Sequence, residues 1–420
     1  MIPEGWASVP LSQIASSSIV YGIVQAGPHV VGGIPYLKSS NVGGKIDVDT
    51  LQCTSPDIHA QYCRSVVRPG DIVISLRGNT GATSIVPSSL IEANLTQGTA
   101  RISVGEDFDH NFIHQQIAGP AVQRQINAAT KGSTFVEITL EDLRKVKVCT
   151  PRRKSEQRRI AEILSTWDRA IATVEALIAN ALAQKQALMQ SLLTGKKRLP
   201  GFTTVWINTS LDQVAKVLVS NVDKKSAAAE QSVRLCNYMD VYRSDQITAN
   251  MDFMVATATT DQVRKFGLRV GDVLITKDSE TPEDIAIPAY VASTTPDLVC
   301  GYHLAIIRPK KGIDGQFLKY FFEHPHTRYF FATRANGATR FGLTIDAITT
   351  APITLPAHDE QRRIAEVIAA AEQEIERLKP IEAALRQEKS ALMQQLLTGK
   401  RRVIVGLESG PSQQTPLTLV

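Results

Sequence analysis

An apolar repeat with a period of 3.5 residues runs from Ile160 to Leu192. If Ile160 and Leu164 lie at the two core positions, a and d, of a heptad repeat, one position holds Ile160, Trp167, Val174, Ala181 and Leu188, and the other holds Leu164, Ile171, Ile178, Lys185 and Leu192. Such a repeat over five heptads is typical of a long helix that packs against another helix. Helices of globular proteins average about 11 to 12 residues. This pattern predicts roughly 38 residues, or about 57 Å at 1.5 Å per residue.

The whole stretch occurs a second time. Residues 156–198 and 360–402 align at a constant offset of 204 without a gap, and 20 of the 43 positions are identical. The second copy places these residues at a and d: Ile364, Ala371, Leu378, Leu385 and Leu392, and Ile368, Ile375, Glu382, Lys389 and Leu396. Because each apolar seam needs a partner, we expect the two helices to pair with each other. Gly195 and Gly399 are expected to end them.

The blocks outside the two helices also repeat, more loosely. Trp6 and Leu11 correspond to Trp206 and Leu211 at an offset of 200, and the strand-like runs that begin at Gly70 and Gly271 correspond at 201. Short β-branched runs separated by Gly, Pro and Asp are typical of strands joined by turns. Each block is therefore predicted to be a mixed, strand-rich globular domain.

These patterns predict an α+β chain with a pseudo-twofold internal repeat. Each globular block must connect the end of one helix to the start of the next, which favours an antiparallel coiled coil with one globular domain at each end. The expected boundaries are residues 1–152 for the first domain, 153–198 for the first helical repeat, 199–356 for the second domain, 357–402 for the second helical repeat, and 403–420 for a tail expected to be flexible because turn-forming residues dominate it.

Most of the identical positions in the two helices do not belong to the seam. Five of the 20 lie at a or d, so pairing of the helices does not account for the other fifteen. Duplication without selection would also leave identities, but the globular blocks, duplicated at the same time, have diverged far more. We therefore interpret the following outward residues as one docking face offered twice to the same partner: Gln157, Arg158, Arg159, Glu162, Met189 and Gln190, with Gln361, Arg362, Arg363, Glu366, Met393 and Gln394.

Composition adds modest constraints. The net charge of +5 and the pI near 8.9 favour a polyanionic partner only weakly. Five scattered cysteines without a CxxC motif indicate neither a disulfide framework nor a zinc site. No apolar run reaches the roughly 18 residues that cross a bilayer, and the first residues do not resemble a signal peptide. We expect a cytoplasmic protein that does not bind membranes.

The repeated motifs resemble the specificity subunit of Type I restriction-modification enzymes. The resemblance spans residues 1 to about 402 and rests on EQRRIAE starting at Glu156 and Glu360, each after a proline (Pro151 and Pro356), and on LLTGK starting at Leu192 and Leu396. It implies two target recognition domains that each read one half of a bipartite, asymmetric double-stranded DNA site. The helices would set the spacing and dock two DNA methyltransferase subunits, which would carry S-adenosylmethionine. The resemblance leaves open whether restriction or translocase subunits join the complex. Pro380, where the first copy has Ala176, departs from the repeat and is expected to kink the second helix.

The best candidate DNA contacts lie on the loops after the equivalent Gly-Asp strands, and a second pair lies around Gly132 and Gly337, where glycine allows close approach to phosphate. Arg77 can pair with guanine through two hydrogen bonds and Asn79 with adenine, although such glycine-rich loops are often only solvated turns. The candidates in the first domain are Arg77, Asn79, Thr80, Lys131, Ser133 and Thr134, with Lys38 and Asn41 as weaker ones. Those in the second domain are Lys277, Ser279, Asn336, Thr339 and Arg340, with Asn237 and Tyr238 as weaker ones.

No catalytic or metal-binding residues are predicted. The chain lacks the Asn/Asp-Pro-Pro-aromatic motif of amino-methyltransferases, and the TGKK sequence at Thr194 does not complete a phosphate-binding loop. The leading hypothesis is thus a non-catalytic DNA-specificity subunit without a cofactor of its own. A coiled-coil adaptor whose globular ends bind proteins is the alternative, and an enzyme in its own right is a third, less favoured one.

Overall fold

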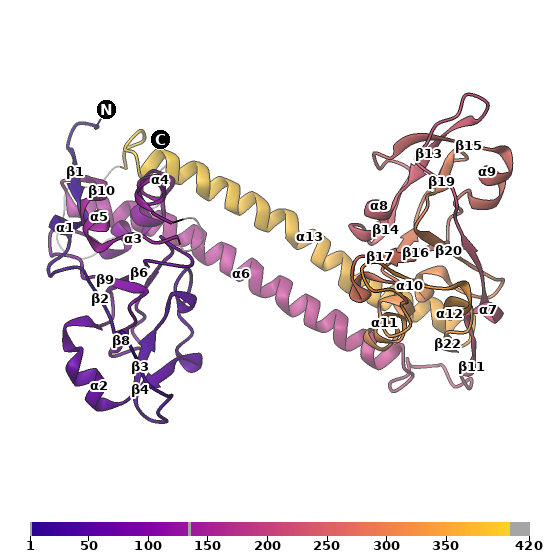
Figure 1. Cartoon of the computed structure of the whole chain (residues 1–420), viewed down its shortest axis with the longest axis horizontal. Helices are drawn as coiled ribbons and strands as arrows, with labels where there is room; N and C mark the ends of the chain where they lie inside the picture. Colours follow the sequence, from indigo (N-terminus) through magenta and orange to yellow (C-terminus); the bar gives the residue numbers. More distant parts are fainter. Residues whose placement is uncertain (1, 133–135, 404–420) are drawn as a thin grey trace. The chain divides into compact units, whose positions relative to one another are not determined.

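The computed structural model describes residues 2–132 and 136–403. The chain divides into two compact units, one of Met1–Glu175 with Pro380–Val420 and the other of Ala176–Lys379. The two long helices are α6 (Lys154–Leu192) and α13 (His358–Leu396), each of 39 residues. Each unit contains one globular domain and parts of both helices (Figure 1). The predicted α+β class with two long helices is confirmed.

The first unit is built on short strands. They are β1 (Trp6–Pro10), β2 (Val20–Tyr21), β3 (Ile34–Leu37), β4 (Gln52–Thr54), β5 (Val66–Val67), β6 (Ile72–Ser75), β7 (Thr83–Ile85), β8 (Ala93–Leu95), β9 (Thr99–Ile102) and β10 (Lys147–Pro151). Two four-stranded sheets have the orders β2-β9-β6-β7 and β4-β3-β8-β5, and β1 pairs antiparallel with β10. The short helices are α1 (Leu11–Ile14), α2 (Pro56–Gln61), α3 (His110–Ala118), α4 (Pro120–Ala129) and α5 (Leu140–Lys145).

The second unit repeats this plan with one five-stranded and one three-stranded sheet in place of the two four-stranded sheets. Its strands are β11 (Ile207–Ser210), β12 (Ala215–Val219), β13 (Gln231–Cys236), β14 (Gln246–Ile247), β15 (Met254–Ala258), β16 (Val273–Thr276), β17 (Asp278–Ser279), β18 (Pro288–Val291), β19 (Leu298–Cys300), β20 (Leu304–Pro309), β21 (Phe341–Gly342) and β22 (Pro352–Leu355). The sheet orders are β12-β20-β16-β18-β14, β15-β13-β19, β11-β22 and β17-β21. Its helices besides α6 and α13 are α7 (Leu211–Val214), α8 (Tyr238–Tyr242), α9 (Thr260–Phe266), α10 (Gly315–Glu323), α11 (Pro325–Ala332) and α12 (Ile345–Thr349).

The long helices run antiparallel within each unit. In the first unit, Ile160 and Leu164 near the start of α6 share a buried core with Leu396 at the end of α13. In the second unit, Ile364 near the start of α13 shares a core with Leu192 at the end of α6. Because the start of one helix packs beside the end of the other in both units, the predicted antiparallel pairing is confirmed.

The two glycine stops form as predicted. Gly195 and Gly399 both have φ of +67°, a left-handed backbone that favours glycine. Just beyond them, Arg198 and Arg402 each hold the buried glutamate at the start of the opposite helix. Arg402 donates two hydrogen bonds to Glu156, at 2.7 and 2.8 Å, and Arg198 donates two to Glu360, at 2.6 and 2.7 Å. These bidentate pairs fasten each helix end to its neighbour.

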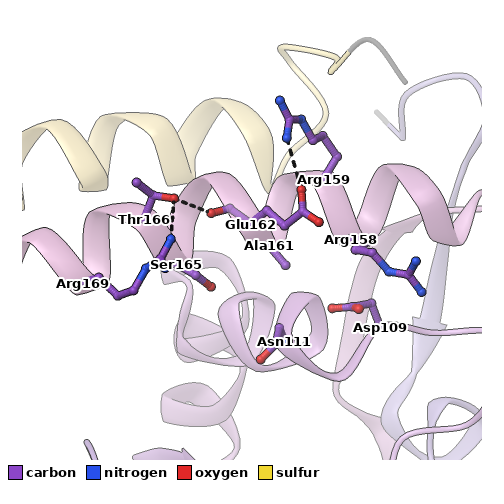
Figure 2. Close-up of a pocket in the computed structure, with 9 residues that line it drawn as sticks. All are labelled: Asp109, Asn111, Arg158, Arg159, Ala161, Glu162, Ser165, Thr166 and Arg169. Carbon is purple, nitrogen blue, oxygen red and sulfur yellow. Dashed lines mark hydrogen bonds and ion pairs between the residues drawn. The ribbon is translucent and has the colours of Figure 1, made fainter. Parts of the chain in front are cut away.

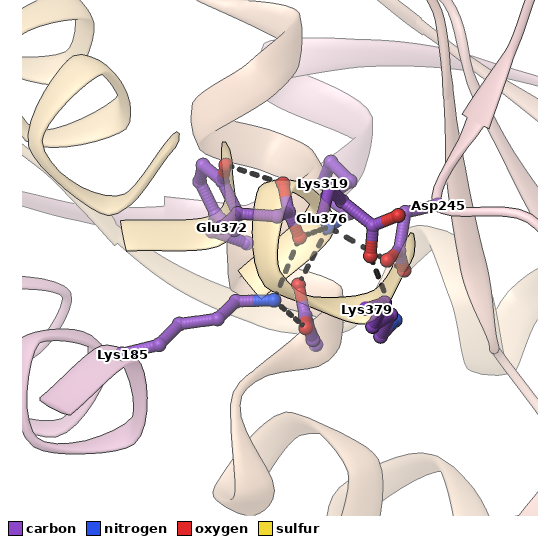
Figure 3. Close-up of polar contacts among 8 residues, drawn as sticks. Lys185, Asp245, Lys319, Glu372, Glu376 and Lys379 are labelled. Carbon is purple, nitrogen blue, oxygen red and sulfur yellow. Dashed lines mark hydrogen bonds and ion pairs between the residues drawn. The ribbon is translucent and has the colours of Figure 1, made fainter. Parts of the chain in front are cut away.

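A buried polar cluster replaces apolar packing at Lys185 in the seam of the second unit. Lys185 and Lys319 both donate to Glu372, at 2.7 and 2.8 Å, and the hydroxyl of Tyr320 donates to its other oxygen at 2.9 Å (Figure 3). Glu323 pairs with both lysines, at 2.6 Å to Lys185 and 2.8 Å to Lys319. The carboxylates are therefore neutralised by ammonium groups rather than arranged around an open space.

The first unit carries a smaller version of this cluster. Lys389, at the position equivalent to Lys185, donates to Asp168, whose other oxygen accepts from Gln115 at 2.7 Å. The same heptad position thus holds a lysine bonded to an acid of the other helix in both units.

Helix α13 continues through Pro380, so the proline does not end the helix. The expected kink stays a prediction. Among the residues that the structure describes, no helix combines the length and apolar character needed to cross a bilayer.

Candidate nucleic-acid interface

Three separate segments of the first domain meet beyond the end of β6. The amide of Asn79 donates to the carbonyl of Val42 at 2.7 Å, next to the turn that holds Lys38 and Asn41. Arg77 forms an isolated β-bridge with Glu137, which also bridges to Lys131. The segments 38–41 and 77–80 and the residues Lys131 and Glu137, far apart in sequence, therefore lie side by side.

The second domain builds the same arrangement. Asp278 pairs with Gly342 in the β17–β21 ladder, and Asn336 bridges to Gly342. These contacts repeat those of Arg77, Glu137 and Lys131 at offsets of 201 and 205. The hydroxyl of Tyr238 donates to Ser279 at 3.4 Å, which brings the turn after β13 to the same place. The repeat predicted from sequence thus extends to the contacts between loops.

Several candidate side chains face outward. The Lys131 ammonium is 77% exposed and lies 3.6 Å from Asp142. Arg77 is exposed and donates to the amide oxygen of Gln97 at 3.3 Å. Asn336, Thr339 and Arg340 are exposed as well. These side chains could reach a ligand without rearrangement, and their contact with DNA stays a prediction.

Other candidates are engaged within the domain. Asn41 accepts a hydrogen bond from the backbone nitrogen of Lys38 at 3.0 Å, and the ammonium of Lys38 donates to Gln52 at 2.5 Å. The Thr80 hydroxyl donates to the carbonyl of Val136 at 2.9 Å. Asn237 donates to the carbonyl of Leu235 at 3.3 Å and begins helix α8. These side chains shape the turns that carry the exposed residues.

Two candidates in the second domain are covered. Ser279 is buried and accepts from Tyr238 and from the backbone nitrogen of Thr281 at 3.3 Å. Lys277 is 16% exposed and its ammonium pairs with Asp278. Both side chains are therefore less accessible than the exposed candidates, although Ser279 lines a cavity of this domain, and their contact with DNA stays a prediction. Ser133 and Thr134 lie outside the described residues.

The two sites differ in charge. In the second domain a cavity of about 530 Å³ is lined by the acids Asp278, Glu280 and Asp284, by aromatic residues and by two basic ones. Tyr238 and Tyr242, on one wall, stack with ring centroids 5.6 Å apart. Burial raises the pKa of Tyr238, and the neighbouring Asp284 carboxylate raises the pKa of Tyr242. Both hydroxyls therefore stay protonated and can donate hydrogen bonds.

Sequence reasoning missed Gln97, Tyr302, His303 and Tyr242 at these sites. Gln97 contacts Arg77, and His303 contacts Asp278 at 2.8 Å. Both come from the segment that leads into the central strand, β9 or β20. No motif marks this segment, so only the pairing of β6 with β9 and of β16 with β20 reveals it.

The outward face of α6 borders an open hollow of about 710 Å³. Arg158, Arg159 and Glu162 line it on the helix, and Asp109 and Asn111 line it at the start of α3 (Figure 2). Arg159 pairs with Glu162 at 3.2 Å. The equivalent residues Arg362, Arg363 and Glu366 line a hollow of about 520 Å³ in the second unit, and Arg363 pairs with Glu366 at 2.9 Å.

The predicted docking residues divide into two groups. Arg158, Glu162, Gln190, Arg362, Arg363, Glu366 and Gln394 are exposed, and Arg159 is half-buried. Gln157 and Gln361 are buried, and each accepts from a backbone nitrogen of its globular domain: that of Asp109 at 2.8 Å and that of Asp314 at 2.9 Å. The prediction that these glutamines face a partner is therefore wrong.

The prediction that Met189 and Met393 belong to the outward docking face is wrong for the same reason. Met189 is part of the core of the second unit, and Met393 packs, partly buried, against the core of the first. Identity at such positions reflects how each helix is fixed to its domain.

Known proteins share this architecture. A solved Type I restriction-modification S subunit from M. genitalium aligns with a TM-score of 0.59 at 14% identity, covering 93% of this chain and 96% of that one. A chain from a structural study of complex assembly and conformational transition of the type I R-M system aligns with a TM-score of 0.53 at 16% identity, covering 96% and 100%. At these identities the likeness shows the fold.

Sequence relatives point the same way. The chain is 29% identical over 200 residues to the Type I restriction enzyme EcoBI specificity subunit of Escherichia coli, and 27% identical over 210 residues to the Type I restriction enzyme MjaVIII specificity subunit of Methanocaldococcus jannaschii. These matches cover 46% and 47% of this chain, and only 41% and 48% of the two relatives.

The sequence model described as the Type I restriction modification DNA specificity domain matches twice, over residues 3–183 and 206–386. Each match contains one globular domain together with most of the helix that follows it. The matches cover most of the chain, and the repeated loops and most of both long helices fall within them. The chain therefore belongs to the family of Type I restriction modification DNA specificity domains.

Proposed function

We propose that this protein is the non-catalytic DNA sequence-specificity subunit of a Type I restriction-modification complex. Each globular domain would read one half of a bipartite, asymmetric site in double-stranded DNA. The paired helices would set the spacing of the halves and dock two copies of a DNA methyltransferase subunit. S-adenosylmethionine would be bound by that partner and not by this chain.

The difference in charge between two otherwise equivalent sites supports this proposal most directly. The same three-segment framework carries Arg77 in the first domain and Asp278 in the second. An arginine donates hydrogen bonds to guanine, whereas an acidic site suits a base edge that presents amino hydrogens. A framework kept in both domains with opposite chemistry is what an asymmetric target requires.

The helix faces support the docking part of the proposal. Arg158, Arg159 and Glu162 recur as Arg362, Arg363 and Glu366, and each set borders an open hollow. Equal side chains exposed in two equivalent places suit two copies of one partner. The hollows are not identical, since Asp109 and Asn111 line the first and Leu199 and Phe202 the second.

Selection from a pool of randomised duplexes tests the proposal. The full chain, purified with the methyltransferase that copurifies from its host, should enrich duplexes with two separated, unlike motifs. Because phosphate contacts release counterions, binding should weaken steeply between 50 and 200 mM salt, by about 10³-fold or more for six phosphate contacts. A pool that shows no base preference at moderate salt would contradict the proposal, and protein partners at both globular ends would favour the adaptor alternative.

A further inference from the structure

His303 lies in a strained backbone conformation at the edge of the second domain's site. Its φ is +74°, in the left-handed region that residues with side chains rarely adopt. Such strain persists only where the surroundings impose it, and it is concentrated at functional sites. The backbone carbonyl of His303 accepts from Lys277 at 2.9 Å, which ties it to the segment that carries Asp278.

The ring of His303 is held in one orientation. Its Nδ1 lies 2.8 Å from an Asp278 oxygen, and its centroid lies 4.1 Å from that of Tyr302. In the neutral ring whose Nδ1–H donates to the Asp278 carboxylate, Nε2 is an acceptor. The side chain is 41% exposed and lines the cavity of about 530 Å³. Nε2 has no partner among the described residues.

In the first domain, the place equivalent to the His303 side chain is occupied by Arg77, which comes from the other segment of the pair. Gly98 occupies the place of His303, since its carbonyl accepts from Leu76 at 2.8 Å as that of His303 accepts from Lys277. A Cβ on Gly98 would lie 3.1 Å from Nε of Arg77 and 2.7 Å from the hydroxyl oxygen of Ser39. Arg77 of the first domain corresponds to Asp278 of the second, and Gly98 corresponds to His303. The large side chain at this place is therefore Arg77 in the first domain and His303, from the neighbouring segment, in the second.

We propose that His303 is a specificity-determining residue of the second domain and that its Nε2 accepts a hydrogen bond from the exocyclic amino group of an adenine or cytosine. Asp278 is a positioning residue that fixes the tautomer and the direction of the ring. The acids around the cavity disfavour a phosphate there and suit a base edge that presents amino hydrogens. The inference rests on the DNA-binding function proposed above and adds the chemical class of base read in one half-site.

The first test compares His303→Gly with the unaltered chain in the same duplex selection. Glycine adopts this backbone without strain, so the variant keeps its fold. Preference at one base pair of one half-site should fall by about 5- to 150-fold, the range expected for loss of a specific base contact. The other half-site should be unchanged. His326→Ala, an exposed histidine of the same domain outside the cavity, should leave the profile intact.

A second probe removes the amino group instead of the histidine. At the affected position, a duplex with purine in place of adenine, or with a cytosine analogue without its amino group, should bind the unaltered chain about 5- to 150-fold more weakly. The His303→Gly variant should bind both duplexes equally. Asp278→Asn, which keeps an acceptor for Nδ1, should retain more preference at that position than Asp278→Ala.

Distinct results overturn the inference and the proposed function. If the unaltered chain selects a bipartite site and His303→Gly selects the same site with equal stringency, the inference fails and the proposed function stands. Loss of preference for guanine or thymine instead would overturn the assignment of Nε2 as acceptor. If the unaltered chain selects nothing, the proposed function and the inference fail together.

Discussion

Glu372 shows how far a single residue supports the second unit. Its buried carboxylate accepts from two ammonium groups and one hydroxyl. Removing the Glu372 carboxylate leaves the buried positive charges of Lys185 and Lys319 with less negative charge to balance them. Loss of one partner of a buried ion pair typically costs about 3–5 kcal/mol.

We therefore expect Glu372→Ala to lower the free energy of unfolding of the second unit by about 3–5 kcal/mol, measured by urea denaturation. Glu376, one turn later on α13, is 58% exposed and pairs with Lys379 (Figure 3). Glu376→Ala is the matched control and should cost less than about 1 kcal/mol. Equal effects of the two substitutions would show that burial of the cluster adds nothing.

The same cluster should make the stability of the second unit depend on pH. Burial alone would raise the pKa of Glu372, but the ammonium groups of Lys319 and Lys185 outweigh it and hold the pKa below its ordinary value of 4.5. An acid whose pKa is lower in the folded state contributes stability above its unfolded pKa and loses it as pH falls through the folded one. Stability should thus fall below about pH 4.5, and denaturation of Glu372→Gln at pH 7 and pH 3.5 should show a smaller decline.

Arg77 offers a test of the first domain. Arg77→Ala should reduce base preference by about 5- to 150-fold at one position of the half-site that the second domain does not read. Arg77→Lys should rescue little, because a lysine lacks the planar fork that contacts a guanine twice. The duplex selection measures both, and an equal loss in both half-sites would contradict the assignment.

At the scale of residues, sequence predicted which loops carry the site better than which side chains face outward. Arg77 follows the end of strand β6, Lys131 follows helix α4 and Arg340 precedes strand β21, and all three are exposed. Ser279 and Lys277 follow an equivalent strand end, but Ser279 is buried and Lys277 is largely covered and paired with Asp278. His303 had no marker at all, since its role depends on the strand pairing and the backbone angle.

At the scale of elements, Pro380 is the main difference between the long helices. Proline removes one helical hydrogen bond and is about 3 kcal/mol less favourable than alanine inside a helix. Proline also restricts the unfolded chain, and this lowers the cost of folding by about 0.4–1 kcal/mol. Pro380→Ala should therefore raise the free energy of unfolding by about 2 kcal/mol, and Ala176→Pro at the equivalent place in α6 should lower it by a similar amount or more. Thermal unfolding of both variants checks this.

The outward arginines predict a change in stoichiometry. Charge reversal in Arg158→Glu should remove one of two docked methyltransferase subunits, and the double variant Arg158→Glu with Arg362→Glu should remove both. Mass measurement of the purified complex distinguishes these states. Arg377→Glu, an exposed arginine of α13 without an equivalent in α6, is the control and should leave two subunits bound.

The long helices were the most predictable elements. Their heptads and glycine stops are local features that a sequence shows directly. The sheets were less predictable, because several strands have only two or three residues and are defined by distant partners. The fifth strand of the second domain's larger sheet, β14, pairs parallel with β18 through two residues only, a contact that no local pattern indicates.

At the scale of the whole molecule, we predict that the two domains specify their half-sites independently. Replacing residues 1–152 with the corresponding block of another family member should change one half of the selected motif and keep the other. Cutting within the strand β10 would break its pairing with β1, so the exchange should include both strands. A change in both halves would show that the domains do not act as modules.

The bonds that hold each site together run mostly through the backbone. Leu76 to Gly98, Lys277 to His303, and the bridges of residues 137 and 342 all join main-chain groups. Side chains at these positions can change without loss of the framework, as the exchange of Arg77 and Gly98 for Asp278 and His303 shows. The base preference that we propose for each domain can therefore change through a few substitutions without loss of the fold.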